Sequence, residues 1–332
     1  MCPRSLSELL DRSLTARKSL FDSRHETAFR LFNGFTEGCP DLVVDLYAAT
    51  VVLDNYTDSP EEGLAFVNEA QGFLQTHLDW LRAGIVKTRS GGSQAEKRGK
   101  LLFGTTPDHK IKEHGIWYAL DLMMNRDASL YLDTRNVRKW AVENLKGKSV
   151  LNTFAYTGSF GVAALAGGAG RVVQLDVNRQ FLNLAKQSYT LNGYPIHKED
   201  FISADFFLQV GRFKRAGEYF DCVFIDPPFF ASSITGKVDQ EHDSARLINK
   251  VRPLINNGGY LVAINNALYV SGKEYMQMLE SLCADGYLKI AGLIPVPDDF
   301  IGYDNTQAGT PITDPSPFNH STKIAVLEVK RK

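Results

Sequence analysis

The chain has 332 residues, of which 44% are hydrophobic and 23% charged, and its net charge is -1. This composition is typical of a soluble globular protein; it excludes a disordered chain and an overall positive field that would attract nucleic acid. The length favours two domains, or one large and one small.

Neither a membrane segment nor a metal site is expected. No apolar run approaches the length of a membrane span, and the N-terminus lacks a signal-type apolar core. Cys2, Cys39, Cys222 and Cys283 are scattered, without a CxxC pair or a histidine at metal-ligand spacing. Reduced structural thiols in a cytoplasmic protein, with no metal and no membrane partner, are the simplest interpretation.

The first part of the chain predicts a small α/β domain over residues 1–125. Leucines at helical spacing indicate helices, and β-rich runs bounded by turn residues indicate strands. The expected elements are helices over 4–20 and 60–81, a hairpin over 42–56, and strand-like runs at 85–88 and 114–120. The segment 90–100 is polar and basic at its end, which favours a solvated loop over a mobile loop that contacts phosphates.

The second part, residues 126–332, alternates strands with helices and predicts a mostly parallel sheet covered on both faces. The expected strands are 149–154, 171–176, one ending within 200–207, 219–226, 259–265, 287–295 and 320–330. The expected helices are 158–166, 179–192, 240–255 and 273–284. The last two strands, joined by the long loop 297–319, are compatible with an antiparallel edge.

A strand, a tight turn at Thr157-Gly158 and a helix follow one another over residues 149–161. A strand that enters a helix through glycine places backbone N–H groups at the carboxyl edge of the sheet, where a polar ligand can lie. The turn lacks the GxGxxG pattern of dinucleotide sites.

Two acids follow neighbouring strands. Asp176 ends its strand at the position where an acid reaches ribose hydroxyls in such sheets, and this role is favoured over a helix N-cap. Asp205 follows the third strand, and contact with a base edge and an N-cap remain equal alternatives.

The strongest signal is Asp226-Pro227-Pro228-Phe229 after an apolar strand. The two prolines remove backbone donors and force the chain to turn outward. We expect the Asp226 side chain and the Pro227 carbonyl to face the pocket, where they accept hydrogen bonds from a base. Phe229 or Phe230 offers a flat face for a planar substrate.

These features together resemble a class I S-adenosylmethionine-dependent methyltransferase. More narrowly, Asp133-Thr134-Arg135-Asn136-Val137-Arg138 is similar to a segment of the bacterial 23S ribosomal RNA methyltransferases of the cytosine-C5 and guanine-N7 type. Residues 30–47 resemble the small domain that precedes the catalytic domain there. The resemblance covers most of residues 28–265. It implies a Rossmann-like fold with a seven-stranded, mostly parallel sheet, S-adenosylmethionine as cofactor, and ribosomal RNA as substrate.

The resemblance also implies the site residues. Those that bind the cofactor are Tyr131, Asp133, Arg135, Arg138, Phe154, Tyr156, Thr157, Gly158, Asp176, Asp205, Phe206 and Asp226. Those that carry the transfer are Asp226, Pro227, Phe229 and Asn265. The turn would surround the methionine part, Asp176 the ribose, Asp205 and Phe206 the adenine, and Asp226 the methyl group and target base.

Two departures from that family affect the expected chemistry. Relatives that methylate cytosine C5 use a cysteine nucleophile after the strand 259–265, where this chain has Asn265-Asn266. Methylation of a base nitrogen is therefore favoured, because it needs only positioning and acceptors for the leaving proton. The N-terminal RNA-binding module of many relatives has no counterpart here, which makes RNA as substrate a weaker expectation than methyl transfer.

Other interpretations are a methyltransferase for a small molecule or a protein, a nicotinamide-dependent oxidoreductase and a non-enzymatic binding module. The oxidoreductase is disfavoured because Asp-Pro-Pro-Phe has no role in hydride transfer, and the binding module leaves the strand-end acids unexplained. A homodimer is left open, because the sequence does not determine the oligomeric state.

Overall fold

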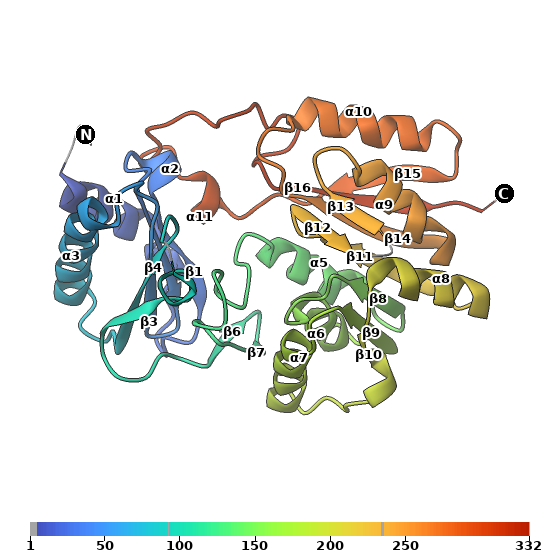
Figure 1. Cartoon of the computed structure of the whole chain (residues 1–332), viewed down its shortest axis with the longest axis horizontal. Coiled ribbons are helices and arrows are strands. Elements are labelled where there is room, and N and C mark those ends of the chain that lie inside the picture. Colours follow the sequence, from blue (N-terminus) through green and yellow to red (C-terminus); the bar gives the residue numbers. More distant parts are fainter. Residues whose placement is uncertain (1–4, 92, 234–235, 332) are drawn as a thin grey trace. The chain divides into compact units, whose positions relative to one another are not determined.

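Residues 5–91, 93–233 and 236–331 are described by a computed structural model (Figure 1). The chain forms two compact units. Unit 1 takes the chain up to Leu132 together with the segment Pro297–Thr310, and unit 2 takes Asp133–Val296 and the chain from Pro311 onward. The units thus divide at 132/133, seven residues after the boundary expected from the sequence, and unit 1 also includes a late segment.

Unit 1 is built on a five-stranded sheet of order β1-β2-β3-β4-β5. Its strands are β1 Ala28–Asn33, β2 Leu42–Tyr47, β3 Thr50–Asn55, β4 Ala83–Thr88 and β5 Lys100–Phe103. β2 and β3 form the hairpin expected from the sequence, with Ala48 at φ 55° in its turn. Apolar residues of α1 Leu6–Ala16 and α3 Pro60–His77 share one buried cluster with the sheet, which explains the leucine spacing of both helices.

The rest of unit 1 consists of short elements. They are η1 Lys18–Leu20, α2 Gly34–Glu37, α4 Gln94–Arg98, β6 Lys110–Glu113, β7 Ile116–Ala119 and α11 Asp298–Ile301. α4 lies in the segment expected to be a loop. Its start is stabilised by a capping box, in which Ser93 and Glu96 satisfy each other's backbone N–H groups, and this Ser-x-x-Glu signal is present in the sequence.

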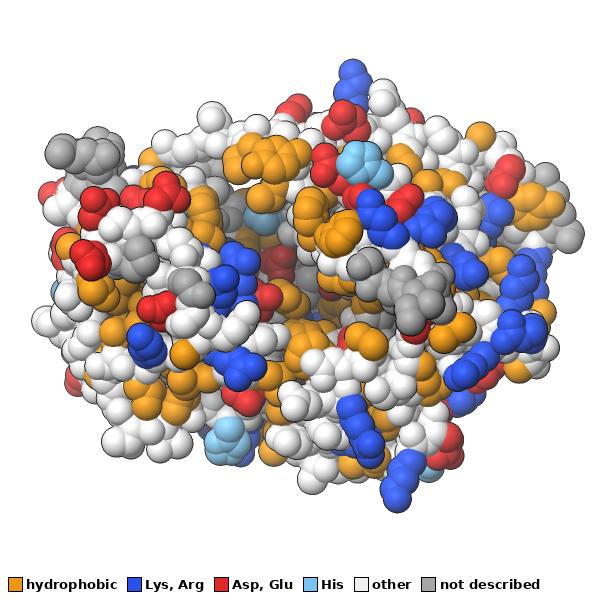
Figure 2. Space-filling view, viewed as in Figure 1, with side chains coloured by type: hydrophobic (Ala, Val, Ile, Leu, Met, Phe, Trp, Pro, Cys, Tyr) orange, Lys and Arg blue, Asp and Glu red, His pale blue; other side chains and the backbone are white. Residues whose placement is uncertain are grey.

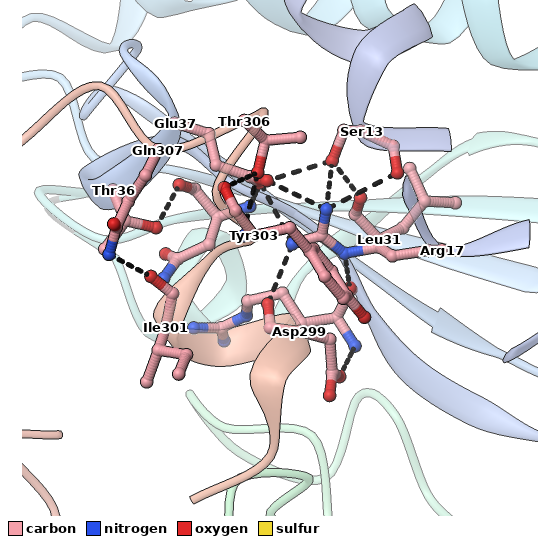
Figure 3. Close-up of polar contacts among 12 residues, drawn as sticks. Ser13, Arg17, Leu31, Thr36, Glu37, Asp299, Ile301, Tyr303, Thr306 and Gln307 are labelled. Atoms are coloured by element: carbon pink, nitrogen blue, oxygen red, sulfur yellow. Dashed lines mark hydrogen bonds and ion pairs between the residues drawn. The ribbon is translucent and has the colours of Figure 1, made fainter. Parts of the chain in front are cut away.

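The buried Arg17 side chain joins the segment that contains α11 to the rest of unit 1 (Figure 3). Arg17 and Glu37 are 0% and 1% exposed, and the Arg17 Nη1–Glu37 Oε1 distance is 2.8 Å. Arg17 Nη2 also donates to the Asp299 carbonyl oxygen at 2.9 Å, and the Asp299 carboxylate accepts from the Arg30 N–H at 2.8 Å. These contacts assign Pro297–Thr310 to unit 1, although it lies far along the chain.

Unit 2 contains a seven-stranded sheet of order β10-β9-β8-β11-β14-β16-β15 (Figure 1). Its strands are β8 Ser149–Thr153, β9 Arg171–Asp176, β10 Phe201–Ser203, β11 Phe220–Ile225, β14 Ile255–Asn265, β15 Leu288–Leu293 and β16 Lys323–Val329. The first five are parallel, and β16 is antiparallel to β14 and β15. The seven-stranded, mostly parallel Rossmann-like sheet is thereby confirmed.

Helices and short turns connect these strands. They are α5 Arg135–Asn144, α6 Ser159–Ala166, α7 Arg179–Leu191, η2 Lys198–Asp200, α8 Phe206–Ala216, α9 Ser244–Val251, η3 Arg252–Leu254 and α10 Gly272–Cys283. The hairpin of β12 Phe230–Ser233 and β13 Gly236–Asp239 was not expected; residues 240–243, expected to be helical, lead from it to α9. Among the described ranges, no helix is both long and apolar enough to cross a bilayer.

Candidate active site

The candidate site lies in unit 2, at the carboxyl edge of the parallel strands. Parallel strands end at the same edge of a sheet, so residues that follow β8, β9, β10, β11 and β14 gather there although they are far apart in sequence. Of the sequence-predicted acids, Asp176 is the last residue of β9, and Asp205 and Asp226 follow β10 and β11.

The turn between β8 and α6 is held in an unusual backbone conformation. Phe154 and Tyr156 have φ values of 52° and 50°, and Gly158 has 76°. Non-glycine residues rarely adopt positive φ, and such strain gathers at functional sites. A Cβ on Gly158 would lie 2.6 Å from the Ala185 Cβ, so glycine is also required by the packing against α7.

Asp176 fixes this turn from the neighbouring strand. Its Oδ2 accepts from the Tyr156 N–H and its Oδ1 from the Asn178 N–H, both at 2.8 Å. The N-cap of α7 is Asn178, whose side chain accepts from the Gln180 N–H, so the N-cap alternative for Asp176 is wrong. Burial raises the pKa of Asp176. Each carboxylate oxygen keeps a lone pair that can accept from a ligand hydroxyl.

Asp205 and Phe206 have structural roles at the start of α8. Asp205 is the N-cap and accepts from the Leu208 N–H at 3.0 Å, which agrees with the capping alternative. Phe206 is 5% exposed and stacks on Phe154, with ring centroids 4.6 Å apart. Their expected contact with adenine stays a prediction.

Asp226 stands at the end of β11 with an altered acidity. Burial and the nearby Asp133 carboxylate raise the pKa of Asp226 to about 7. Asp133 itself accepts a hydrogen bond from Thr322 Oγ1 at 3.1 Å. In the part of the chain that the structure describes, Asp226 has no ion pair, so its charge is available to a cationic or N–H-bearing ligand.

Gln240 changes the interpretation of Pro227. The Gln240 Nε2 donates to the Pro227 carbonyl, so this oxygen contacts the protein and not, as expected, a pocket. The Gln240 Oε1 accepts from the Asn266 N–H at 2.6 Å, and Gln240 is only 1% exposed. One buried amide therefore links the loops after β11 and β14. Sequence reasoning missed it because its partners are distant along the chain.

Asn265 is likewise engaged by the protein. Its Nδ2 donates to the Gln240 carbonyl at 2.8 Å and to Ser244 Oγ at 2.9 Å, and its Oδ1 accepts from the Ala267 N–H at 3.0 Å. Asn265 is 1% exposed, whereas the side chain of Asn266 is exposed. The geometry thus gives Asn265 a structural role and leaves Asn266 as the more accessible amide.

Lys323, on the neighbouring strand β16, fixes the loop that follows β14. Its Nζ donates to the carbonyls of Ala267 at 2.9 Å and Val270 at 3.0 Å, and burial lowers its pKa to about 8.

The segment before β8 is divided between the units. Tyr131 belongs to unit 1, where its hydroxyl donates to Asp127 Oδ2 at 3.0 Å. Arg138 lies on α5, is 0% exposed and donates to Thr134 Oγ1 at 3.0 Å; Arg135 begins the same helix and is half-buried. Of the four predicted residues in this segment, only Asp133 and Arg135 lie in unit 2 and are at least partly exposed.

No described thiol has the properties of a nucleophile. Cys222 is fully buried in β11, and burial raises the pKa of its thiol. Burial also raises the pKa of Cys283 at the end of α10, whereas a nucleophilic cysteine needs a lowered pKa. Cys39 is buried in unit 1, and Cys2 lies outside the described residues. Among the described residues, no group of acidic, histidine or cysteine side chains is arranged to hold a metal.

The strained turn, Asp176 and Asp226 fit the three parts of S-adenosylmethionine: its amino acid, its ribose and its sulfonium cation. The sheet and this edge together define a Rossmann-like methyltransferase.

The family comparison agrees. The model of the S-adenosylmethionine-dependent methyltransferase family matches residues 95–300, more than half of the chain. The chain belongs to this family, and S-adenosylmethionine is its cofactor.

Two relatives are similar in sequence. Ribosomal RNA large subunit methyltransferase I of Photobacterium profundum is 29% identical over 266 residues, which cover 80% of this chain and 67% of the relative. The protein of the same name from Aeromonas salmonicida is 32% identical over 220 residues, covering 66% of this chain and 55% of the relative. The chain therefore spans only about half to two thirds of these relatives.

Solved structures share the fold. The crystal structure of SMU.776 complexed with SAH has a TM-score of 0.84 at 23% identity, covering 98% of this chain and 81% of that one. The tRNA m1G37 methyltransferase of M. jannaschii has a TM-score of 0.51 at 14% identity, covering 86% and 73%. At these identities the likeness establishes the fold alone.

Proposed function

We propose that this methyltransferase transfers the methyl group to a nitrogen of a base in ribosomal RNA. The observation that carries the proposal is Asp226: a carboxyl with a pKa of about 7, without an ion pair among the described residues, three residues before the 48% exposed Phe229. The names of the two relatives support ribosomal RNA as the substrate, and we propose the cytoplasm as the location because ribosomes are there.

In this proposal the cofactor is held by residues at the strand ends. The turn of Phe154, Tyr156, Thr157 and Gly158 holds the methionine part, and Asp176 accepts from the ribose hydroxyls. Asp205 and Phe206 border the adenine. Within unit 2, Asp133, Arg135 and Arg138 complete the surroundings, with buried Arg138 acting through Thr134. When bound, S-adenosylmethionine supplies an electrophilic methyl group.

The chain's own contribution is positioning and proton acceptance. Phe229 stacks on the target base, and Asp226 accepts a hydrogen bond from a base N–H. Pro227 and Asn265 contribute indirectly, because their hydrogen bonds with Gln240 hold the loops after β11 and β14 together. Methylation of cytosine C5 would instead require a cysteine that adds to the ring, and the raised thiol pKa values of Cys222 and Cys283 argue against it.

A small-molecule or protein substrate is the second candidate. The net charge of -1 favours it, because the chain has no overall positive field that would attract RNA.

Radiolabelled methyl transfer tests the proposal. Purified protein is incubated with S-adenosylmethionine and ribosomal RNA from a strain that lacks the gene, and the labelled nucleoside is identified by mass spectrometry. We expect an N-methylated base, formed with wild type and formed about a hundredfold more slowly with Asp226→Ala. Labelled 5-methylcytosine would contradict the nitrogen assignment. Label in protein or metabolite fractions, with none in RNA, would contradict RNA as substrate.

A further inference from the structure

The hairpin β12–β13 directly follows Asp226-Pro227-Pro228-Phe229, and two consecutive aromatic residues where it begins are exposed. Phe229 is 48% exposed and Phe230 is 56% exposed. The hairpin is two-sided: Val238, opposite Ala231, is buried at 4%, whereas Phe230 and Lys237 belong to the outer face. The buried face explains why the hairpin packs on unit 2, but it does not explain a large aromatic side chain on the outer face.

Cations accompany these rings. Lys237 Nζ lies 5.1 Å from the centroid of the Phe230 ring and 2.9 Å from Asp239 Oδ2, which holds it in place. Beside the hairpin, the Arg246 guanidinium of α9 lies 5.3 Å from the centroid of the Phe207 ring on α8.

Both pairs belong to one continuous surface. Arg246 Nη2 donates to the Lys237 carbonyl. The Phe207 ring packs on the Gly236 backbone so closely that a Cβ there would lie 2.5 Å from the ring. Figure 2 shows Lys and Arg side chains gathered over the region of α8 and α9.

The base of the hairpin is fixed beside the methyl-transfer edge. Gln240 follows β13 directly, and its side chain bonds to Pro227 and Asn266, while its N–H donates to the Phe229 carbonyl at 3.1 Å. A base placed at Asp226 therefore has its chain neighbours within reach of the hairpin's outer face.

An exposed ring with cations beside it has a particular use. Single-stranded nucleic acid is bound by stacking its bases on aromatic side chains while cations contact the phosphates, and cation–π pairs add to this. We propose that Phe230 and Lys237, with Phe207 and Arg246 beside them, form a stacking surface for the unpaired nucleotides that flank the target base. This inference rests on the proposed RNA substrate and specifies its single-stranded form.

The chain offers a matched control. Tyr219 is 46% exposed with the Arg331 guanidinium 4.4 Å from its ring centroid, but it precedes β11 and so lies at the opposite end of that strand. Tyr219→Ala removes the same kind of exposed ring without touching the hairpin.

The experiment measures anisotropy of a short fluorescein-labelled single-stranded RNA with Phe230→Ala, Phe230→Trp, Lys237→Ala and Tyr219→Ala, alongside cofactor affinity. We expect Phe230→Ala to weaken RNA binding about tenfold, near the low end of one lost stacked base, and to raise KM for RNA while cofactor affinity stays unchanged. Phe230→Trp and Tyr219→Ala should bind like wild type. Lys237→Ala should reduce the slope of log affinity against log salt by about one.

The outcomes separate this inference from the proposed function. If wild type methylates RNA and Phe230→Ala binds RNA equally well, the stacking surface is overturned and the proposed function stands. If duplex RNA or poly-glutamate competes as well as the single strand, the surface binds charge and not bases, which also overturns it. If wild type binds cofactor but neither binds nor methylates RNA, both proposals fail.

Discussion

The carboxylate of Asp176 accepts a 2.8 Å hydrogen bond from the backbone N–H of Tyr156, which ties the end of β9 to the turn after β8. This bond joins a strand-end acid to a turn that contains two non-glycine residues at positive φ. The arrangement explains why a strained turn persists: the surrounding side chains determine its conformation.

Replacing Asp176 tests its assigned role. We expect Asp176→Ala to weaken S-adenosylmethionine binding by about tenfold or more, because it removes charged hydrogen bonds to the ribose and releases the turn. Isothermal titration calorimetry measures the affinity. Asn178→Ala, which removes only the α7 cap, should change it little; an equal loss in both variants would indicate a merely structural effect.

Asp226 predicts a dependence of stability on pH. Its pKa of about 7 exceeds the roughly 4 of an unfolded chain, so the folded state binds more protons between these values. The stability that it contributes is complete below about pH 4 and is lost as the pH rises through about 7. The melting temperature should therefore fall over this range more in wild type than in Asp226→Asn. Parallel curves would contradict the raised pKa.

The same group predicts the pH profile of catalysis. Only the ionised carboxylate can take up the proton that leaves the base, so the methyl-transfer rate should rise with pH and level off above about 7. Asp226→Asn should flatten the profile, and Asp226→Ala should lower the rate about a hundredfold. A wild-type profile without this rise would remove the assigned proton-accepting role.

Gln240 predicts a positioning effect. Gln240→Ala removes both bonds between the loops after β11 and β14, and we expect the turnover rate to fall about a hundredfold while cofactor affinity stays near wild type. Gln240→Glu keeps the acceptor for Asn266 but loses the donor to Pro227, so an intermediate rate is expected. Gln209→Ala, a buried glutamine on α8, serves as the control in single-turnover assays.

The buried pair Arg17–Glu37 predicts a stability effect in unit 1. Glu37→Ala leaves the Arg17 guanidinium buried without its carboxylate, which should cost about 3–5 kcal/mol of unfolding free energy in urea titrations. Arg82→Ala breaks a pair whose arginine side chain is 66% exposed and should cost less than about 1 kcal/mol. Equal losses of unfolding free energy in the two variants would mean that burial does not determine the cost of breaking an ion pair.

The sequence by itself determined the strand–helix alternation and the placement of Asp176 at the end of β9 and of Asp226 directly after β11. Apolar runs, a glycine turn and two prolines act within a few residues, so they are visible along the chain. The hairpin 42–56 was predictable for the same reason. The capping box of α4 was equally local and could have been found.

The tertiary structure alone decided which polar groups at the carboxyl edge of the unit 2 sheet are still available to a ligand. Pro227 and Asn265 looked accessible in the sequence, but Gln240 engages both, across 13 and 25 residues of chain. It likewise placed Pro297–Thr310 in unit 1 through Arg17 and Asp299, 282 residues apart. Buried hydrogen-bond donors and acceptors must find partners, and those partners are set by packing and not by sequence distance.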